Sequence, residues 1–143
     1  MVINQYCYRL AALANQTANS IGIINLQTDW LYAQFMHESD GMTSKLAIEN
    51  HNLGGLTQET PNGDENKQPD GAYWYKKFDS YESYSVYFGA YLKGFMDGSG
   101  VQNATTKNEY LTALKDSPSG MYFTASLEEY ITGTDYWLAQ MNV

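Results

Sequence analysis

The 143-residue chain can bury one hydrophobic core and is short for two domains, so we expect a single domain over residues 1–143. Sixteen acidic against eight basic residues give a formal charge of −8, and Lys and Arg form no stripe that could neutralise phosphates, which argues against nucleic acid as a partner. The single cysteine, Cys7, excludes an intramolecular disulfide, and the two histidines provide no zinc-ligand spacing. We therefore expect neither a metal nor a cofactor, and Cys7 as a small core residue.

The N-terminal residues lack the basic start, continuous apolar core and small-residue cleavage site of a signal peptide. No apolar run approaches the roughly 20 residues that cross a bilayer. We expect no membrane insertion, and export by another route if the protein acts outside the cytoplasm. A fragment of a longer chain would look the same.

Apolar residues at helical spacing predict a first helix over residues 3–18. A second helix, capped by Thr28 and Asp29, is apolar nearly all round through Met36, which predicts a buried central helix. Asp40-Gly41 is a helix-stop signal, so Glu38 lies on its last turn. Residues 44–50 follow as a short helix.

Residues 52–71 form a long polar stretch without apolar periodicity, which predicts a functional insertion. We expect a small hairpin over residues 52–78, with 72–78 as its return strand. Three capping boxes then predict three further helices, beginning at Asp79 with Glu82, Thr106 with Glu109, and Ser126 with Glu129. The fold class is therefore mainly α (α+β), a helical domain with a small β-hairpin lobe.

Glu38 combines two features that disfavour a carboxylate. The C-terminal end of a helix is its negative pole, and neighbours such as Phe35 are apolar. Both raise the pKa, and a glutamic acid still protonated near neutral pH can donate a proton to a leaving sugar oxygen, as glycosidases require. The alternative interpretation is an ordinary solvated glutamate at a helix end.

The stretch AQFMHESDGMTSKLAIENHNLGGLTQ, residues 33–58, resembles the signature of the bacterial glucosaminidase family of peptidoglycan hydrolases, glycoside hydrolase family 73. In that family a helix ending in Ala-Gln-x-x-x-Glu-Ser/Thr precedes Gly, Ser-x-Leu-Ala and Asn-Asn-Leu-Phe-Gly. FDSYESYSVYFGAYL and the later MYF resemble two further segments of the family. The resemblance covers about residues 4–132. It implies a lysozyme-like α-domain and a small β-lobe, on either side of a groove that holds a glycan strand.

The resemblance also implies site residues. Glu38 is the expected general acid, on the floor of the groove, and Asn52 and Gly55 are expected to shape the loop beneath the sugar and contribute to substrate binding. Gly54 stands where the family usually has Phe, which removes an aromatic wall and puts the fit of the substrate in question.

A second carboxylate is expected in the β-lobe, where counting back from Phe78 favours Glu65 as the second catalytic residue. The alternatives are Glu59, Asp64 and Asp70. A separation of about 6.5–9.5 Å from Glu38 would indicate a base that activates water, and about 5–5.5 Å a nucleophile. A third alternative is attack by the substrate's own 2-acetamido group, which Tyr87 or Tyr122 would position.

The remaining aromatic residues and histidines allow weaker expectations. Strand alternation turns Tyr73 and Tyr75 to one face and Trp74 to the other, so that one face either stacks on sugar rings or fills the lobe's core. Tyr84, Tyr87, Phe88 and Tyr91 fall at helical spacing and are expected to be mostly core, apart from Tyr87. We expect His37 to point to another side of the helix than Glu38 and to serve packing.

The sequence thus predicts a monomeric endo-β-N-acetylglucosaminidase that acts on the peptidoglycan glycan strand of the cell wall, in the periplasm or outside the cell. An N-acetylmuramidase on the same scaffold, or a non-catalytic wall-binding or phage tail module, remains the alternative. The biological setting stays open between a phage lysin, a tail enzyme and a secreted effector; an effector would need an immunity or inhibitor protein.

Overall fold

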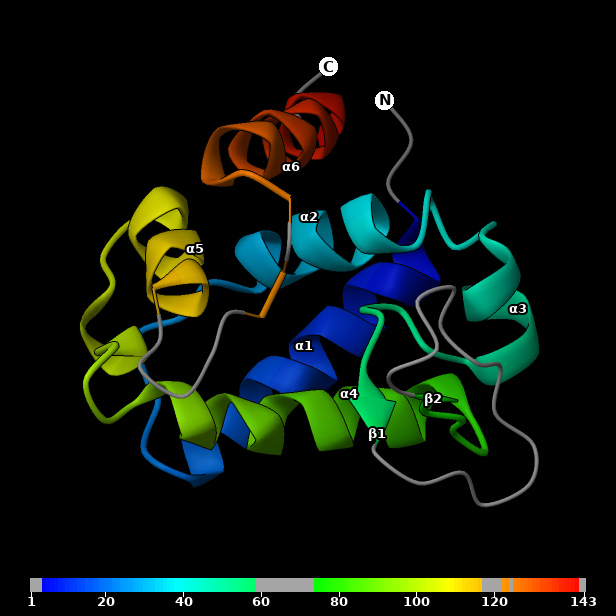
Figure 1. Cartoon of the computed structure of the whole chain (residues 1–143), viewed down its shortest axis with the longest axis horizontal. Coiled ribbons are helices and arrows are strands. Elements are labelled where there is room, and N and C mark those ends of the chain that lie inside the picture. The colour runs from blue at the N-terminus through cyan, green and yellow to red at the C-terminus, as the bar shows by residue number, and fades with distance from the viewer. Residues whose placement is uncertain (1–3, 59–73, 117–121, 124, 142–143) are drawn as a thin grey trace.

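Helices dominate the computed structural model, which describes residues 4–58, 74–116, 122–123 and 125–141 (Figure 1). The one described sheet is a two-stranded hairpin. This is the predicted mainly α architecture with a small β-lobe. In chain order the elements are α1 Gln5–Ser20, α2 Thr28–Glu38, α3 Lys45–Asn50, β1 Thr57–Gln58, β2 Trp74–Tyr75, α4 Tyr81–Tyr91, the 3-10 helices η1 Leu92–Phe95 and η2 Val101–Asn103, α5 Lys107–Lys115 and α6 Leu127–Met141.

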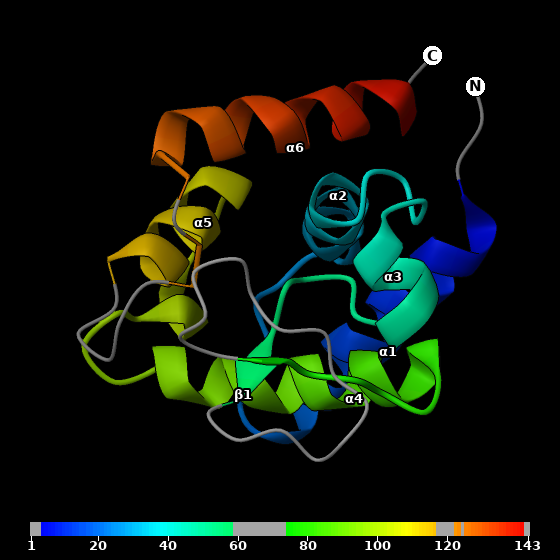
Figure 2. The same cartoon turned by 45° about the vertical axis from the view of Figure 1, so that its right-hand side comes forward.

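α2 is the central helix, and Figure 2 looks nearly along it, with α6 above and α1 and α4 below. Its six consecutive residues from Leu31 to Met36 are buried on all sides, as its apolar sequence predicts. Its start differs from the prediction. Gln27 occupies the cap position without a side-chain cap, and Thr28 is already helical. Asp29 lies in the first turn and accepts a hydrogen bond from the Tyr8 hydroxyl.

α1 packs against both α2 and α4. It begins at Gln5, two residues later than predicted, because the Asn4 side chain caps it by accepting from the Cys7 amide at 2.9 Å. A Cβ on Gly89 of α4 would overlap the Ala14 carbonyl oxygen of α1, so this glycine permits the close crossing of the two helices. The buried residues of α1 form one stripe: Cys7, Leu10, Ala11, Ala14 and Ala18.

β1 and β2 pair antiparallel, with Thr57 opposite Tyr75 and Gln58 opposite Trp74. The Lys76 amide extends the ladder by donating to the Leu56 carbonyl at 2.8 Å. A hairpin is therefore present where it was predicted, with a return strand shorter than residues 72–78. Tyr73 lies outside the described residues.

Two of the three predicted boxes have their hydroxyl cap, although the Glu109 carboxylate accepts from the Thr105 amide and not from that of Thr106. The hydroxyls of Thr106 and Ser126 accept from the Glu109 and Glu129 amides, each at 3.1 Å. The box at Asp79 is wrong, because the Ser80 hydroxyl caps α4 by accepting from the Ser83 amide. None of the helices in the described ranges is long and apolar enough to cross a membrane.

Candidate active site

Glu38 is the last residue of α2, as the stop signal predicts. The chain then makes a tight turn through Asp40, Gly41 and Met42, which all have positive φ. Buried Ser39 holds this turn, since its hydroxyl donates to the Phe35 carbonyl at 2.6 Å and accepts from the Met42 amide at 2.9 Å. Glu38 is thus fixed at the boundary between a rigid buried helix and a rigid turn.

The loop that faces Glu38 is built around Asn52. Its side-chain amide donates to the Leu56 and Lys76 carbonyls at 2.9 and 2.8 Å, and its carbonyl oxygen accepts from the Gly54 and Leu56 amides. The side chain is 1% exposed. Asn52 therefore holds the loop through its own hydrogen bonds, and its part in substrate binding stays a prediction.

Gly55 brings this loop close to the acid. Its φ is +66°, and a Cβ built on it would lie 4.0 Å from Glu38 Oε2. Only glycine adopts such a conformation freely, and it leaves the backbone uncovered beside the carboxyl group. Gly55 therefore lies beside Glu38, and its part in substrate binding stays a prediction.

A cavity of about 310 Å³ opens over Glu38. Its lining comes from the end of α2, the Gly54-Gly55 turn, the β-hairpin and the chain entering α6. The described lining residues are His37, Glu38, Gly54, Gly55, Tyr75, Tyr122, Phe123, Ala125 and Tyr130.

Burial raises the pKa of Glu38 to about 7, and the nearby Tyr130 hydroxyl partly opposes this rise. Burial raises the pKa values of three nearby tyrosine hydroxyls well above their usual range, and the negative charge of ionised Glu38 raises them further. These residues are Tyr84, Tyr122 and Tyr130. Glu38 can therefore be protonated near neutral pH among hydroxyl groups that stay protonated.

A family model described as mannosyl-glycoprotein endo-beta-N-acetylglucosaminidase, named glucosaminidase, matches residues 11–141. The chain belongs to the glucosaminidase family. Its members are glycoside hydrolases. No relative was found among the curated proteins.

Two solved structures share the fold of this glucosaminidase domain. The catalytic domain of the autolysin Auto from Listeria monocytogenes matches with a TM-score of 0.66 and 17% identity, over 99% of this chain and 86% of that chain. A type VI secretion system effector-immunity complex from Pseudomonas protegens matches with a TM-score of 0.52 and 17% identity, over 95% of this chain and 96% of that one.

A smaller cavity of about 130 Å³ adjoins the first across the Gly54-Gly55 turn and Tyr122. Tyr87 and Tyr91 of α4 line it, stacked with ring centroids 6.2 Å apart and 40% and 38% exposed. Tyr122 lies between the two cavities, whereas Tyr87 lines only the second. Tyr84 and Phe88 are core, and Tyr91 is more exposed than its helical spacing suggested.

Tyr122 and Tyr84 fill the space that Gly54 leaves open. The Tyr122 hydroxyl donates to the Gly54 carbonyl at 3.0 Å, and a Cβ on Gly54 would overlap the hydroxyl oxygens of both tyrosines. Tyr122 lines both cavities, whereas Tyr84 is fully buried, so it is the Tyr122 ring that borders the cavities beside Gly54.

His37 packs as predicted, with its ring edge-on to Tyr130 at 4.8 Å and against Gly133. It also lines the Glu38 cavity, so the two side chains diverge less than neighbours on a helix usually do. Burial, and then the charge of Lys107, lowers the pKa of His37, which keeps its ring neutral at pH 7.

The second carboxylate is not placed, because Glu65 and its alternatives Glu59, Asp64 and Asp70 lie outside the described residues. Within the described part, no three His, Cys, Asp or Glu side chains are grouped as a metal site. Another hollow, of about 380 Å³, lies beside η2 and α5; its described lining residues include neither an aromatic side chain nor Glu38.

Proposed function

We propose that the protein is a peptidoglycan hydrolase, an endo-β-N-acetylglucosaminidase that cleaves β-1,4 bonds with Glu38 as general acid. The observation that carries this proposal is the Glu38 carboxyl group, buried at the end of α2 with a pKa of about 7, in a cavity rimmed by aromatic side chains. Such an acid holds its proton where most glutamates have lost theirs, which matches general acid catalysis.

The reaction begins with a glycan strand lying along the two adjoining cavities. Glu38 donates its proton to the glycosidic oxygen as the bond from C1 to that oxygen breaks, which leaves an oxocarbenium-like sugar and a neutral alcohol. The Glu38 carboxylate then gains the negative charge. Tyr130 and the uncovered backbone at Gly55 lie close to where that charge develops.

The opposite face of the sugar needs a second group. We propose Glu65 for this role, with the substrate's 2-acetamido oxygen as the alternative. The two predict different kinetics: Glu65→Gln abolishes turnover if Glu65 activates water or acts as nucleophile, and leaves most turnover if the acetamido group attacks. The anomeric configuration of the first product, followed by NMR, then separates inversion from retention.

Peptidoglycan as the substrate is supported by the family and by the likeness to an autolysin catalytic domain. Tyrosine-lined surfaces suit this polymer, since sugar rings pack on flat apolar faces while hydroxyls accept and donate. An N-acetylmuramidase is the alternative, because the same acid could protonate either of the two alternating bonds.

The type VI effector-immunity complex supports a second proposal about setting. The protein acts on the cell wall and, if it is an effector, binds an immunity protein that occludes the groove. We propose delivery by a phage or a specialised secretion route, and a monomeric enzyme. Co-purification with the product of an adjacent gene, with loss of lysis in the complex, would test the effector setting.

The proposal is tested with Glu38→Gln and the matched surface variant Glu49→Gln, whose side chain is exposed on α3. Loss of wall lysis in the first and not in the second, with native circular dichroism for both, is the expected result. Lysis retained by Glu38→Gln would remove Glu38 from the chemistry. A lack of lysis by the wild type together with tight wall binding would favour a binding module.

A further inference from the structure

The hydroxyl of Tyr130 is the polar group on α6 that faces the proposed acid, and its ring has almost no freedom. Phe123 stacks on one side with centroids 4.0 Å apart, and His37 packs edge-on at 4.8 Å. The residue is 1% exposed. The direction of its hydroxyl proton is therefore decided by the polar atoms around it.

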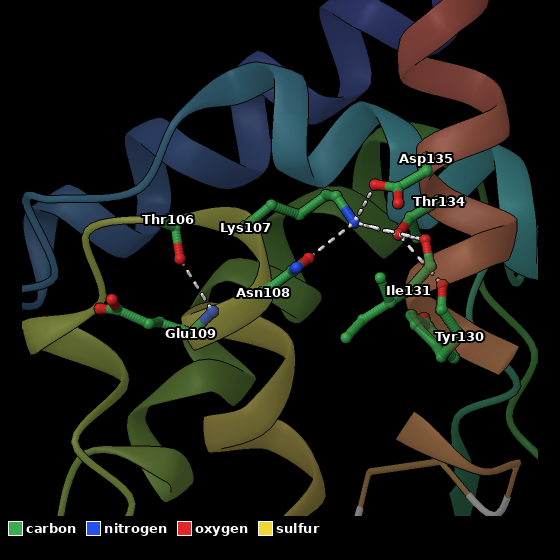
Figure 3. Close-up of polar contacts among 8 residues, drawn as sticks. All are labelled: Thr106, Lys107, Asn108, Glu109, Tyr130, Ile131, Thr134 and Asp135. Carbon is green, nitrogen blue, oxygen red and sulfur yellow. Dashed lines mark hydrogen bonds and ion pairs between the residues drawn. The ribbon is translucent and has the colours of Figure 1, made fainter. Parts of the chain in front are cut away.

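The backbone of α6 at Tyr130 is anchored to α5 by buried Lys107 (Figure 3). The Lys107 ammonium donates to the Thr134 hydroxyl at 2.6 Å and forms an ion pair with Asp135 at 2.9 Å. The Thr134 hydroxyl in turn donates to the Tyr130 carbonyl at 3.0 Å. This clamp fixes the turn of α6 that carries Tyr130.

Gln34 lies one helical turn before Glu38 on α2, so both side chains emerge on the same face. Gln34 is fully buried, and its carbonyl oxygen accepts a short hydrogen bond from the Tyr110 hydroxyl of α5. Tyr110 is itself buried and stacks on Trp30. With the carbonyl end occupied by Tyr110, the NH₂ end of Gln34 must point the other way.

Gln34 Nε2 and Tyr130 Oη, like Tyr84 Oη, are buried polar atoms without a hydrogen-bond partner of good geometry among the described residues. A hydrogen bond from a Gln34 N–H to Tyr130 Oη would satisfy both of the first two atoms, and the nearby Gln34 amide already lowers the pKa of Tyr130. That bond would leave the Tyr130 proton free to point to the Glu38 carboxyl group, whose pKa the Tyr130 hydroxyl lowers. Without this constraint, a tyrosine hydroxyl could equally accept a proton from neutral Glu38.

We infer that Tyr110, Gln34 and Tyr130 form a buried relay that fixes the Tyr130 hydroxyl as a hydrogen-bond donor to Glu38. The inference rests on the proposed function of Glu38. Gln34 and Tyr110 are then positioning residues that act through Tyr130. The hydrogen bond strengthens as Glu38 becomes a carboxylate, so the relay assists proton donation at the moment the charge appears.

The relay is tested by titrating the Glu38 carboxyl carbon by ¹³C NMR in the wild type, Tyr130→Phe, Tyr110→Phe and the double variant. Removing the donor should raise the pKa of Glu38 by about one unit in Tyr130→Phe, and by less in Tyr110→Phe. The double variant should match Tyr130→Phe alone, because both substitutions break one chain of hydrogen bonds. The alkaline limb of kcat/KM should move by the same amounts.

Tyr32→Phe is the matched control, since Tyr32 is equally buried and its hydroxyl accepts from the Asn4 amide, remote from the relay. It should leave the titration unchanged. Additive shifts from Tyr110 and Tyr130, or no shift beyond that of Tyr32→Phe, would overturn the relay. If Tyr110→Phe fails to fold, Gln34→Met with Tyr110→Phe removes both polar partners and tests the same prediction.

The titration does not depend on turnover, so the two proposals fail separately. Wall lysis retained by Glu38→Gln defeats the proposed function. An unchanged titration in Tyr130→Phe defeats the relay even if Glu38 is the acid.

Discussion

Tyr122 and Gly54 are hydrogen-bonded to each other where the two cavities adjoin. The tyrosine hydroxyl donates to the glycine carbonyl at 3.0 Å and occupies the space where any other residue would carry its Cβ. The same turn presents Gly55 to Glu38. The contact therefore connects the segment before α6 to the loop beside the proposed acid.

Gly54→Ala should destabilise the protein by about 1–3 kcal/mol, because the new methyl group overlaps the Tyr84 and Tyr122 hydroxyls and forces them apart. The matched control is Gly94→Ala in η1, where a Cβ would meet nothing within 4 Å. Urea unfolding of both variants provides the comparison. Equal midpoints would show that the tyrosines move aside without cost.

Glu38 should make stability fall as pH rises. The pKa of Glu38 is about 7 in the folded state, above the reference value of 4.5 that applies to the unfolded chain. Between pH 4.5 and 7 the folded protein therefore keeps the Glu38 proton, whereas the unfolded chain loses it. The contribution is fully present below pH 4.5 and is lost as pH rises through 7, by about 3 kcal/mol in total.

Glu38→Gln removes this titration. The variant should unfold at similar urea concentrations to the wild type at pH 5, and at higher ones at pH 8.5. If the urea midpoints of the two proteins change with pH in the same way, the carboxyl group of Glu38 is solvated in the folded state.

Asn52→Asp should destabilise the loop that faces Glu38. The substitution replaces a donor of two hydrogen bonds with an oxygen that faces the Leu56 and Lys76 carbonyls, at a cost of about 2–4 kcal/mol. Exposed Asn103→Asp is the control. The melting temperature of Asn52→Asp should be clearly below that of Asn103→Asp. A loss of activity without a loss of stability in Asn52→Asp would instead indicate that Asn52 contacts the substrate directly.

Lys107→Ala should destabilise the protein by about 2–4 kcal/mol, because it removes the buried hydrogen bond to Thr134 and leaves a cavity between α5 and α6. Asp135→Asn should cost at most about 1 kcal/mol, because the side chain of Asp135 is 59% exposed and its ion pair is screened. Denaturant unfolding measures both. If Asp135→Asn lowers the free energy of unfolding by more than this, the ion pair and not the hydrogen bond to Thr134 is the main stabilising contact of Lys107.

The sequence was most informative where a local rule acts alone. Stop residues placed Glu38 at the end of α2, and hydroxyl caps located the starts of α5 and α6 to within a residue. At α4 two candidate caps were adjacent, Asp79 and Ser80, and only the geometry of the loop selects the serine.

The surroundings of Glu38 could not be predicted, because they come from distant segments. Gln34 belonged to the recognised motif, but its partners Tyr110 and Tyr130 lie on α5 and α6, and helical spacing alone marks them as ordinary core residues. The contact of Gly54 with the hydroxyls of Tyr84 and Tyr122 likewise joins segments that no local pattern connects.

The role of Glu38 is tested most directly by mass spectrometry of the reducing ends released from purified peptidoglycan by the wild type and by Glu38→Gln. We expect new reducing N-acetylglucosamine ends from the wild type and none from the variant. Reducing N-acetylmuramic acid ends would mean that the other alternating bond is cleaved, by an N-acetylmuramidase on the same scaffold. The absence of new ends from the wild type, or equal release by Glu38→Gln, would contradict a glucosaminidase that acts through Glu38.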